Sequence, residues 1–294
     1  MNIVHNMNMI HDSTSADISQ PRPGTRALIQ NLWSLVSPDG FESPRPTHSA
    51  MPYRSAHKRG IKPLADVYLP TADQAHSASV VLVHGGGFFL GSRTMKPMRF
   101  LAGRLLDAGF SVCSIDYRLI LRGGRLGECC EDVADAVLWW HQQCEDWALD
   151  PAEISLIELN TNATLSLMTA ANKQLPTPKR LVSVFGVYDY EYMRGIGQWL
   201  PKLLLQDNEH SHWREHSVIN GPQPTCPTLL LHGDADALVP VAQAHNLATT
   251  RKQLGLPTAM RIYPNAPHGF FNYRTDTADT AARDIVSFLT GELT

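Results

Sequence analysis

Apolar residues from Lys62 onward gather in short continuous runs, and longer amphipathic stretches separate these runs. A short run without polar alternation is typical of a strand that is covered on both faces of a sheet. The stretches between the runs place apolar residues three and four positions apart, as Val133, Ala136, Val137 and Trp140 do. Because the two patterns alternate, we predict an α/β fold whose mostly parallel central sheet is flanked by helices.

The individual elements follow from where each pattern begins and ends. The predicted strands cover residues 64–69, 80–84, 111–116, 154–159, 181–187, 228–232 and 260–263. The predicted helices cover residues 98–108, 130–147, 161–171, 241–254 and 278–289. A further amphipathic helix is expected over residues 25–36, after a polar tail and before a loop rich in Pro and Ser over 37–49.

This order of elements divides the chain into two unequal parts. Residues 1–49 are predicted to form an N-terminal tail and a cap helix, and residues 50–294 a single α/β domain. Within the domain, residues 189–224 depart from the even alternation and are rich in Tyr and Trp. Together with the N-terminal helix they could form a small cap over a site, or they could be a surface excursion with its own aromatic cluster. Both interpretations stay open at this stage.

Net charge and composition indicate which class of molecule the protein binds. The formal net charge is −3, from 25 basic and 28 acidic residues, and the sequence has no basic run. We therefore expect a small-molecule substrate or ligand rather than nucleic acid. The five cysteines are odd in number and lack a C-x-x-C spacing, which argues against a disulfide framework and against a zinc site. We expect neither a metal nor another cofactor.

The N-terminus has no apolar core of the kind found in signal peptides, and no apolar run approaches the length of a membrane span. The expected location is therefore cytoplasmic, without a membrane partner. Whether the chain forms a homodimer is left open.

Three motifs follow strand-like runs and point to chemistry. They are His-Gly-Gly-Gly-Phe at 84–88, His-Gly-Asp-Ala-Asp at 232–236 and Pro-His-Gly-Phe at 267–270. Consecutive glycines let a backbone approach a substrate closely with its N–H groups exposed. An acid followed by a histidine is the order in which one common hydrolase fold carries the acid and the general base. The motifs therefore predict a catalytic site at the carboxyl edge of the sheet.

These motifs resemble those of the hormone-sensitive-lipase-like esterases in the α/β-hydrolase superfamily. The run Asp-Tyr-Arg-Leu at 116–119 also matches that family, and the resemblance covers roughly residues 64–289. It implies that the N–H groups of Gly86 and Gly87 donate to a developing oxyanion. The alternative is a plain glycine turn after a strand.

The same resemblance assigns the acid and the base. Asp236, rather than Asp234, fits the family's turn Gly-x-x-Asp followed by Val-Pro, and Asp234 fits better as a residue that stabilises the turn. His268 lies where the family has its general base. If the site is inactive, Asp236 could instead cap a helix, and His268 could be one more solvated histidine among thirteen.

The nucleophile is missing from its expected place. Where the family has Gly-x-Ser-x-Gly, this chain has Glu-Leu-Asn-Thr-Asn at 158–162, so that Asn160 occupies the position of the serine. An amide nitrogen is not a nucleophile, although Asn tolerates positive φ and can keep the turn. The N–H of Thr161 could complete the oxyanion hole. Glu158, with a side chain expected to be charged, and Asn162 replace the glycines, which should hinder close packing of strand and helix.

Three functions fit this set of residues, and the sequence leaves open whether the protein is an enzyme. It could act on an ester, a lactone or another carbonyl compound without a covalent step, by water-mediated hydrolysis, cyclisation or elimination. It could be an inactive homologue that binds a ligand or a partner protein, similar in kind to the plant gibberellin receptor. It could also be a weak carboxylesterase with an unrecognised nucleophile, for example after deamidation of Asn160. The complete oxyanion loop and acid–base pair favour the first function, and the loss of the elbow glycines favours the second.

Overall fold

The computed structural model describes residues 29–30, 33–34, 43–54, 63–160, 163–193 and 199–293. Its strands are β1 (His48–Pro52), β2 (Leu64–Tyr68), β3 (Ser79–Val83), β4 (Ser111–Ile115), β5 (Ile154–Leu159), β6 (Leu181–Val184), β7 (Thr228–Gly233) and β8 (Thr258–Tyr263). Its helices are α2 (Lys96–Asp107), α3 (Leu126–Gln143), α4 (Ala163–Ala171), α5 (Trp199–Leu205), α6 (His210–His216), α7 (Ala242–Gln253) and α8 (Asp276–Thr290). Within this part of the chain the strands form one sheet in the order β1-β2-β4-β3-β5-β6-β7-β8.

The sheet is mostly parallel. Only β2 pairs antiparallel, with β1 on one side and β4 on the other, and the strands from β4 across to β8 run in one direction. Val83 at the end of β3 lies opposite Ile115 of β4 and Glu158 of β5. Gly233 at the end of β7 lies opposite Tyr263 of β8. The residues that follow these strands therefore emerge at the same edge of the sheet.

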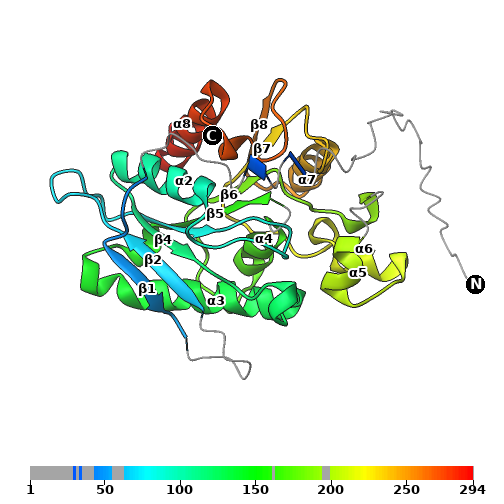
Figure 1. The fold of residues 1–294 in the computed structure, drawn as a ribbon, viewed down its shortest axis with the longest axis horizontal. Helices are drawn as coiled ribbons and strands as arrows, with labels where there is room; N and C mark the ends of the chain where they lie inside the picture. Colours follow the sequence, from blue (N-terminus) through cyan, green and yellow to red (C-terminus); the bar gives the residue numbers. More distant parts are fainter. Residues whose placement is uncertain are drawn as a thin grey trace, which may run out of the picture.

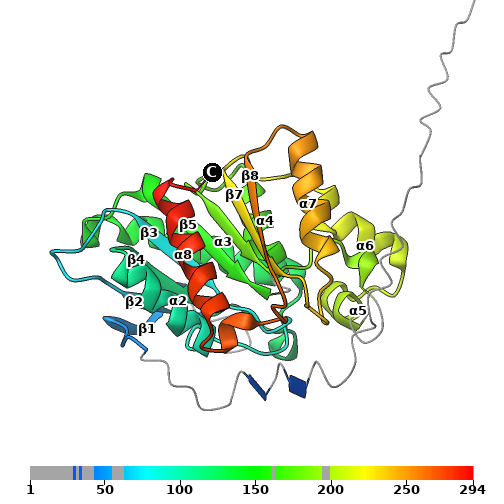
Figure 2. The ribbon, with the colours of Figure 1, turned by 90° about the horizontal axis from the view of Figure 1, so that it is seen from above.

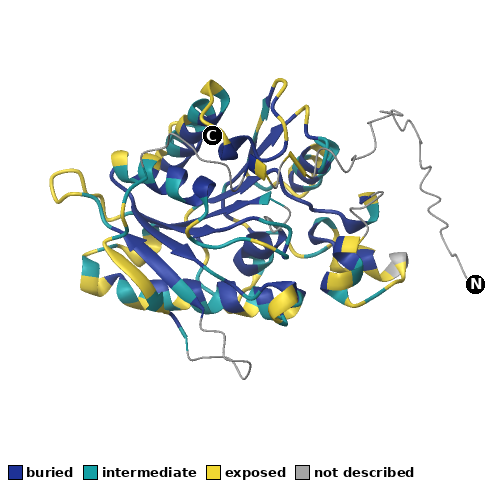
Figure 3. Cartoon of the chain, viewed as in Figure 1, coloured by how far each residue is buried: buried dark blue, intermediate teal, exposed yellow. Residues whose placement is uncertain are grey.

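Helices cover both faces of the sheet, and this explains why its strands are continuous apolar runs. Helices α2 and α8 pack on one face, and α3, α4 and α7 on the other (Figures 1 and 2). The central strands are buried throughout, and exposed residues lie on the outer surfaces of the helices and in loops (Figure 3). The predicted α/β architecture is therefore confirmed.

Several boundaries differ from the prediction, each for a local reason. Helix α3 begins at Leu126 rather than at 130, because Arg125 and Glu128 form a capping box at its start. Strand β6 ends at Val184, and Phe185 then turns the chain with φ 41°. Strand β1 was not predicted, and its first two residues lie in the loop expected over 37–49. It is an edge strand with four of its five residues exposed, so the apolar alternation that marks a strand is absent.

The segment 189–224 contains helices α5 and α6, which lie together at one end of the molecule near α7 (Figures 1 and 2). It is fastened to the domain through Gln243 of α7, whose Oε1 accepts from the N–H groups of Tyr188 and Asp189 at 2.9 and 2.8 Å. Trp213 of α6 is fully buried, whereas Trp199 of α5 is 63% exposed. Trp213 belongs to the main hydrophobic core on this face of the sheet, so the segment packs one aromatic side chain into the domain and exposes another. The helix expected over 25–36 lies mostly outside the described residues, although 29–30 and 33–34 are helical.

Candidate active site

The loop after β7 holds Asp236 in a dense set of hydrogen-bond donors. Its Oδ1 accepts from the N–H groups of Leu238 and Val239 at 2.9 and 2.8 Å. Its Oδ2 accepts from His268 Nδ1 at 2.7 Å and lies 3.3 Å from His232 Nε2. Burial alone would raise the pKa of Asp236, but the charge of His268 and the hydrogen bonds from His232 and His268 outweigh it, so the pKa lies well below its ordinary value. Asp236 is therefore an ionised, fixed acid.

His268 lies in the loop after β8 and is 7% exposed. Because Nδ1 donates to the Asp236 carboxylate, Nε2 is the basic nitrogen of the neutral ring. The ring also meets Phe185 edge to face, with centroids 4.9 Å apart. Phe185 directly follows β6, which is the neighbour of β5 in the sheet. His268 is thus oriented by an acid on one side and packed beside the end of β6 on the other.

Asp234 has the structural role predicted from its place in the turn. It is exposed, and its Oδ1 accepts from the N–H of Asn265 at 2.6 Å. This contact ties the loop of Asp236 to the loop of His268. Asp236 therefore binds the imidazole, and Asp234 connects the two loops that carry Asp236 and His268.

The glycine loop after β3 has the backbone that its sequence predicts. Gly86 and Gly87 have φ values of 114° and 63°, and both are partly exposed. A Cβ on Gly86 would lie 2.1 Å from the carbonyl oxygen of Leu90, so no other residue fits there. Among the described residues, their N–H groups have no hydrogen-bond acceptor. They are therefore available as donors to an oxyanion, as the resemblance implies.

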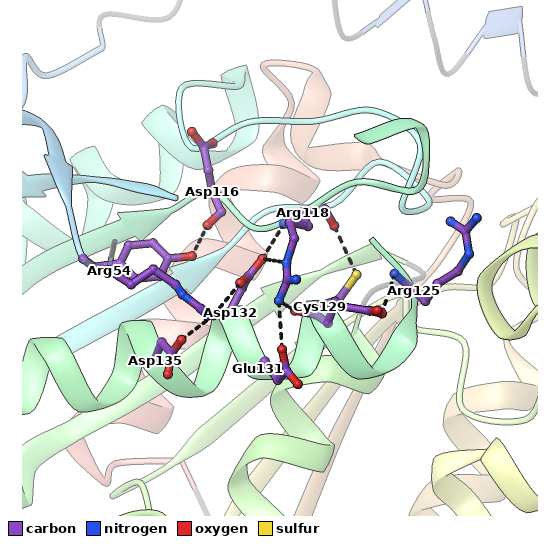
Figure 4. Close-up of polar contacts among 10 residues, drawn as sticks. Arg54, Asp116, Arg118, Arg125, Cys129, Glu131, Asp132 and Asp135 are labelled. Carbon is purple, nitrogen blue, oxygen red and sulfur yellow. Dashed lines mark hydrogen bonds and ion pairs between the residues drawn. The ribbon is translucent and has the colours of Figure 1, made fainter. Parts of the chain in front are cut away.

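The residues after β4 brace this loop. The N–H of Ile120 donates to the carbonyl of Phe88 at 2.8 Å. Arg93, at the far end of the loop, donates to Asp66 of β2 at 2.8 Å and also pairs with Asp116. Arg118 is held in turn by the buried Asp132 of α3, to which both its N–H and its Nε donate at 2.8 Å (Figure 4). The run at 116–119 therefore has a structural role that supports the oxyanion loop.

Asn160 follows β5 at the position of a nucleophile elbow. Its φ is 73°, the left-handed conformation that such a turn requires. A Cβ on Gly85 would lie 2.6 Å from Asn160 Cβ, so the oxyanion loop and the elbow are in direct contact. Thr161, the expected third oxyanion donor, and Asn162 lie outside the described residues. The structure thus brings Asn160 and the glycine loop together at the edge of the sheet where Asp236 and His268 also lie.

The side chain of Glu158 contacts the helix that follows the elbow. It is fully buried, and its Oε2 accepts from the N–H of Ser166 in α4 at 2.6 Å. Burial raises the pKa of Glu158 well above its ordinary value, which favours the neutral form of the side chain over the charged form expected from the sequence. Sequence reasoning treated Glu158 only as a missing glycine. The signal that could have revealed more was an acidic residue near the end of an otherwise apolar strand.

A cavity of about 510 Å³ lies beside the acid–base pair. His268 and Pro267 line it together with the apolar side chains of Ile29, Trp33, Leu238 and Tyr273. The sequence placed a cap helix in this region, with Ile29 and Trp33 among its apolar positions, but did not place these two side chains beside His268.

The N-terminal residues at this cavity are anchored through Ser34. Its hydroxyl accepts from Asn272 Nδ2 at 2.9 Å and its carbonyl from Lys96 Nζ at 3.0 Å. His268 thus faces a largely apolar space that the N-terminal segment helps to form.

Neither a metal centre nor a membrane span is evident in the described ranges. There, no group of three or more His, Cys, Asp or Glu side chains is arranged to hold a metal ion. None of the helices in those ranges combines the length and the apolar character that crossing a bilayer requires.

Comparison with known proteins supports the architecture. Residues 65–192 match the family model described as BD-FAE, and residues 165–294 match that of the prolyl oligopeptidase family. A truncated carbohydrate esterase from gut microbiota superposes with a TM-score of 0.71 at 20% identity, over 86% of this chain and 98% of that one. For apo esterase 2 of Thermogutta terrifontis the TM-score is 0.68 at 19% identity, over 86% and 98% of the two chains.

The acetyl ester-xyloside bifunctional hydrolase of Caldicellulosiruptor lactoaceticus superposes with a TM-score of 0.70 at 18% identity, over 85% of this chain and 98% of that one. Identities this low establish the fold and not the activity. The order of the strands and these superpositions lead to one conclusion: the chain has the α/β-hydrolase fold.

Proposed function

We propose that the protein hydrolyses a small uncharged ester or lactone without forming a covalent intermediate. The observation that carries this proposal is the buried hydrogen bond of 2.7 Å between His268 Nδ1 and the ionised Asp236, in a histidine that lines a cavity. The largely apolar lining favours a substrate with an apolar portion. The structural neighbours named as esterases lend support to the ester substrate class.

In the proposed reaction, His268 Nε2 removes a proton from water as the water oxygen attacks the carbonyl carbon. Asp236 stabilises the resulting imidazolium and keeps the ring in place. The N–H groups of Gly86 and Gly87 stabilise the negative charge on the former carbonyl oxygen. When the intermediate collapses, the alcohol leaves with the proton that His268 holds, and the acid is the second product. The side-chain amide of Asn160 orients the water or the substrate and forms no bond to carbon.

The test is turnover of a panel of p-nitrophenyl esters by the wild-type protein and by single variants. His268→Ala should lower kcat/KM by about 100-fold or more, because general-base catalysis is worth that much. Asn160→Ala should lower it by a smaller factor, because the amide only positions a reactant. His245→Ala on the exposed surface of α7 is the matched control and should leave turnover unchanged. Turnover that survives His268→Ala unaltered would contradict the proposal.

The absence of a covalent step has its own test. A fluorophosphonate probe should not label the peptide that contains Asn160, because an amide does not displace fluoride from phosphorus. Peptide mass spectrometry of protein treated with the probe checks this. Labelling at that peptide would show that a nucleophile acts there after all, and a mass shift from Asn160 to Asp would support the weak carboxylesterase instead.

One observation favours a second function, which is ligand binding without turnover. The cavity is lined by His268 and by N-terminal residues, whereas Asn160 is not part of its lining. A ligand could therefore occupy the cavity without meeting the elbow. Tight binding of an apolar ester whose concentration stays constant over hours, weakened by Trp33→Ala, would establish this function in place of the first.

A further inference from the structure

The turn that carries Asn160 is built differently from the glycine-flanked turn that the family resemblance implies. Glu158 stands two residues before Asn160, in the middle of the sheet, opposite Val83 of β3 and Ser183 of β6. A carboxyl group at a fully buried position costs free energy unless it makes hydrogen bonds. Its presence there therefore needs a structural explanation.

The carboxyl group contacts the helix that follows the turn. Glu158 Oε2 lies 2.6 Å from the backbone nitrogen of Ser166, in the first turn of α4. An oxygen acceptor near the start of a helix is favoured by the positive end of the helix dipole. The contact joins the end of β5 to the start of α4 across the turn that contains Asn160.

We propose that Glu158 is the positioning residue of this turn: its carboxyl group ties β5 to α4 and thereby presents Asn160 to the site. The tie replaces the close packing that glycines allow. It does not depend on whether the site hydrolyses an ester or only binds a ligand, because it concerns the turn itself.

The groups around Glu158 influence whether its carboxyl group is protonated. The titratable side chains near it are those of the partly buried Cys130 and of the buried Tyr188 and Tyr190, and all three are neutral at physiological pH because burial raises their pKa values. Among the described residues no cation offsets its charge, and burial raises its pKa. The carboxyl group, whose neutral form burial favours, accepts from Ser166 through one oxygen, while its other oxygen, Oε1, is buried without a partner in the described structure. A neutral side chain of the same shape with one acceptor oxygen should therefore do the same work.

This reasoning separates a hydrogen-bonded tie from simple packing. Glu158→Gln keeps the length, the neutral state and the acceptor oxygen. Glu158→Met keeps the approximate volume and removes the acceptor. If Glu158 only fills space, the two variants will behave alike. If it ties the turn, only the Gln variant will reproduce the wild-type protein.

The experiment uses the full chain and two measurements. Hydrogen exchange by mass spectrometry reports on the peptide that spans β5 and the start of α4, with a peptide from α8 as internal control. The side-chain amide peaks of Asn160, in protein labelled with [15N]Asn and assigned by their loss in Asn160→Asp, report on the site. In Glu158→Met the α4 peptide should exchange about tenfold faster and the Asn160 peaks should move, as expected when one buried hydrogen bond is lost. In Glu158→Gln both should match the wild type, and the α8 peptide should be unchanged in both variants.

Equal behaviour of the Gln and Met variants would overturn the proposal, as would faster exchange in the Gln variant alone. Should the Met variant fail to fold, Glu158→Asp takes its place, because it keeps the carboxyl group but shortens its reach by one methylene. Faster exchange and moved Asn160 peaks in the Asp variant support the tie, and wild-type behaviour in both measurements overturns it.

Discussion

Two buried carboxyl groups stand at the carboxyl ends of strands in this sheet, and their surroundings are opposite. Asp236, after β7, accepts from two backbone N–H groups and from His268, with His232 also near. Glu158, near the end of β5, accepts from one N–H group, that of Ser166. The first has a lowered pKa and the second a raised pKa. Burial is common to both, so the number and charge of the donors decide which acid is ionised.

The comparison also separates the part of the site that matches the family resemblance, the loop of Asp236, from the part that departs from it, the residues around Asn160. The loop of Asp236 is arranged to hold an imidazole in one orientation, which suits a general base. After Glu158, Asn160 has the left-handed backbone conformation of an elbow, with an amide in place of a nucleophile. The proposed function follows from the first region, and the loss of a covalent step follows from the second.

The largest loss of stability should come from removing the carboxylate of Asp236, which accepts several hydrogen bonds. Asp236→Ala removes the acceptor of two backbone N–H groups and of His268 Nδ1, and loss of one partner of a buried ionic contact costs about 3–5 kcal/mol. Urea unfolding at pH 7 measures the free energy of unfolding. Asp236→Asn, which keeps one acceptor oxygen, should cost less. A loss below that of an ordinary surface substitution would mean that the donors of this loop do not depend on Asp236.

The next effect concerns pH and has opposite signs for the two acids. The pKa of Glu158 is raised on folding, so above the ordinary Glu value of about 4.3 the unfolded chain loses a proton that the folded chain keeps. Its contribution to stability is therefore complete below that value and is lost as the pH rises, by up to about 1.4 kcal/mol per pH unit. Glu158→Gln abolishes this loss, so the free energy of unfolding of the variant should rise relative to that of the wild type between pH 4 and pH 7.

Asp236 should act in the other direction. Its pKa is lowered on folding, so its contribution is complete above the ordinary Asp value of about 3.9 and is lost as the pH falls. Thermal unfolding of the wild type, Glu158→Gln and Asp236→Asn across pH 3–8 checks both signs. A gap between the wild type and Glu158→Gln that does not change with pH would show that Glu158 titrates normally in the folded chain.

The difference between the two regions also shows what the sequence could predict. The alternation of apolar runs and amphipathic stretches was sufficient for the parallel sheet, because burial on both faces leaves a mark on every residue of a strand. The pairing of Asp236 with His268 followed from motif order, because both residues come directly after strands that end at one edge. Asp234 was also placed in its turn from spacing alone.

Contacts between distant segments left no such mark. The acceptor for the N–H of Ser166 is eight residues away on a strand, and nothing in the local pattern of Glu158 points to α4. Strand β1 was missed because an exposed edge strand carries no apolar alternation. Lys96 and Asn272 bind Ser34, from which they are far apart in the sequence. The cavity beside His268 could therefore not be predicted from the sequence.

A smaller effect on stability should separate the contribution of the backbone conformation at Asn160 from that of its side chain. Asn160 has φ 73°, where Ala is strained by about 1–2 kcal/mol and Gly is not. Asn160→Ala should therefore lower the free energy of unfolding by about 1 kcal/mol, and Asn160→Gly by clearly less. Urea unfolding of both variants measures the difference. Equal losses would mean that the amide contacts, and not the backbone conformation, stabilise the turn.

The smallest effect should come from the exposed aspartate two residues before Asp236. Asp234 accepts one hydrogen bond, from the N–H of Asn265, at an exposed position where water can replace it. Asp234→Ala should therefore cost only about 0.5–1 kcal/mol in urea unfolding. Because this bond ties the two loops that carry Asp236 and His268, the variant should also exchange the Asn265 amide faster, as hydrogen exchange would show. A loss as large as that of Asp236→Ala would mean that the connection between the loops, rather than the number of donors around a buried charge, dominates this region.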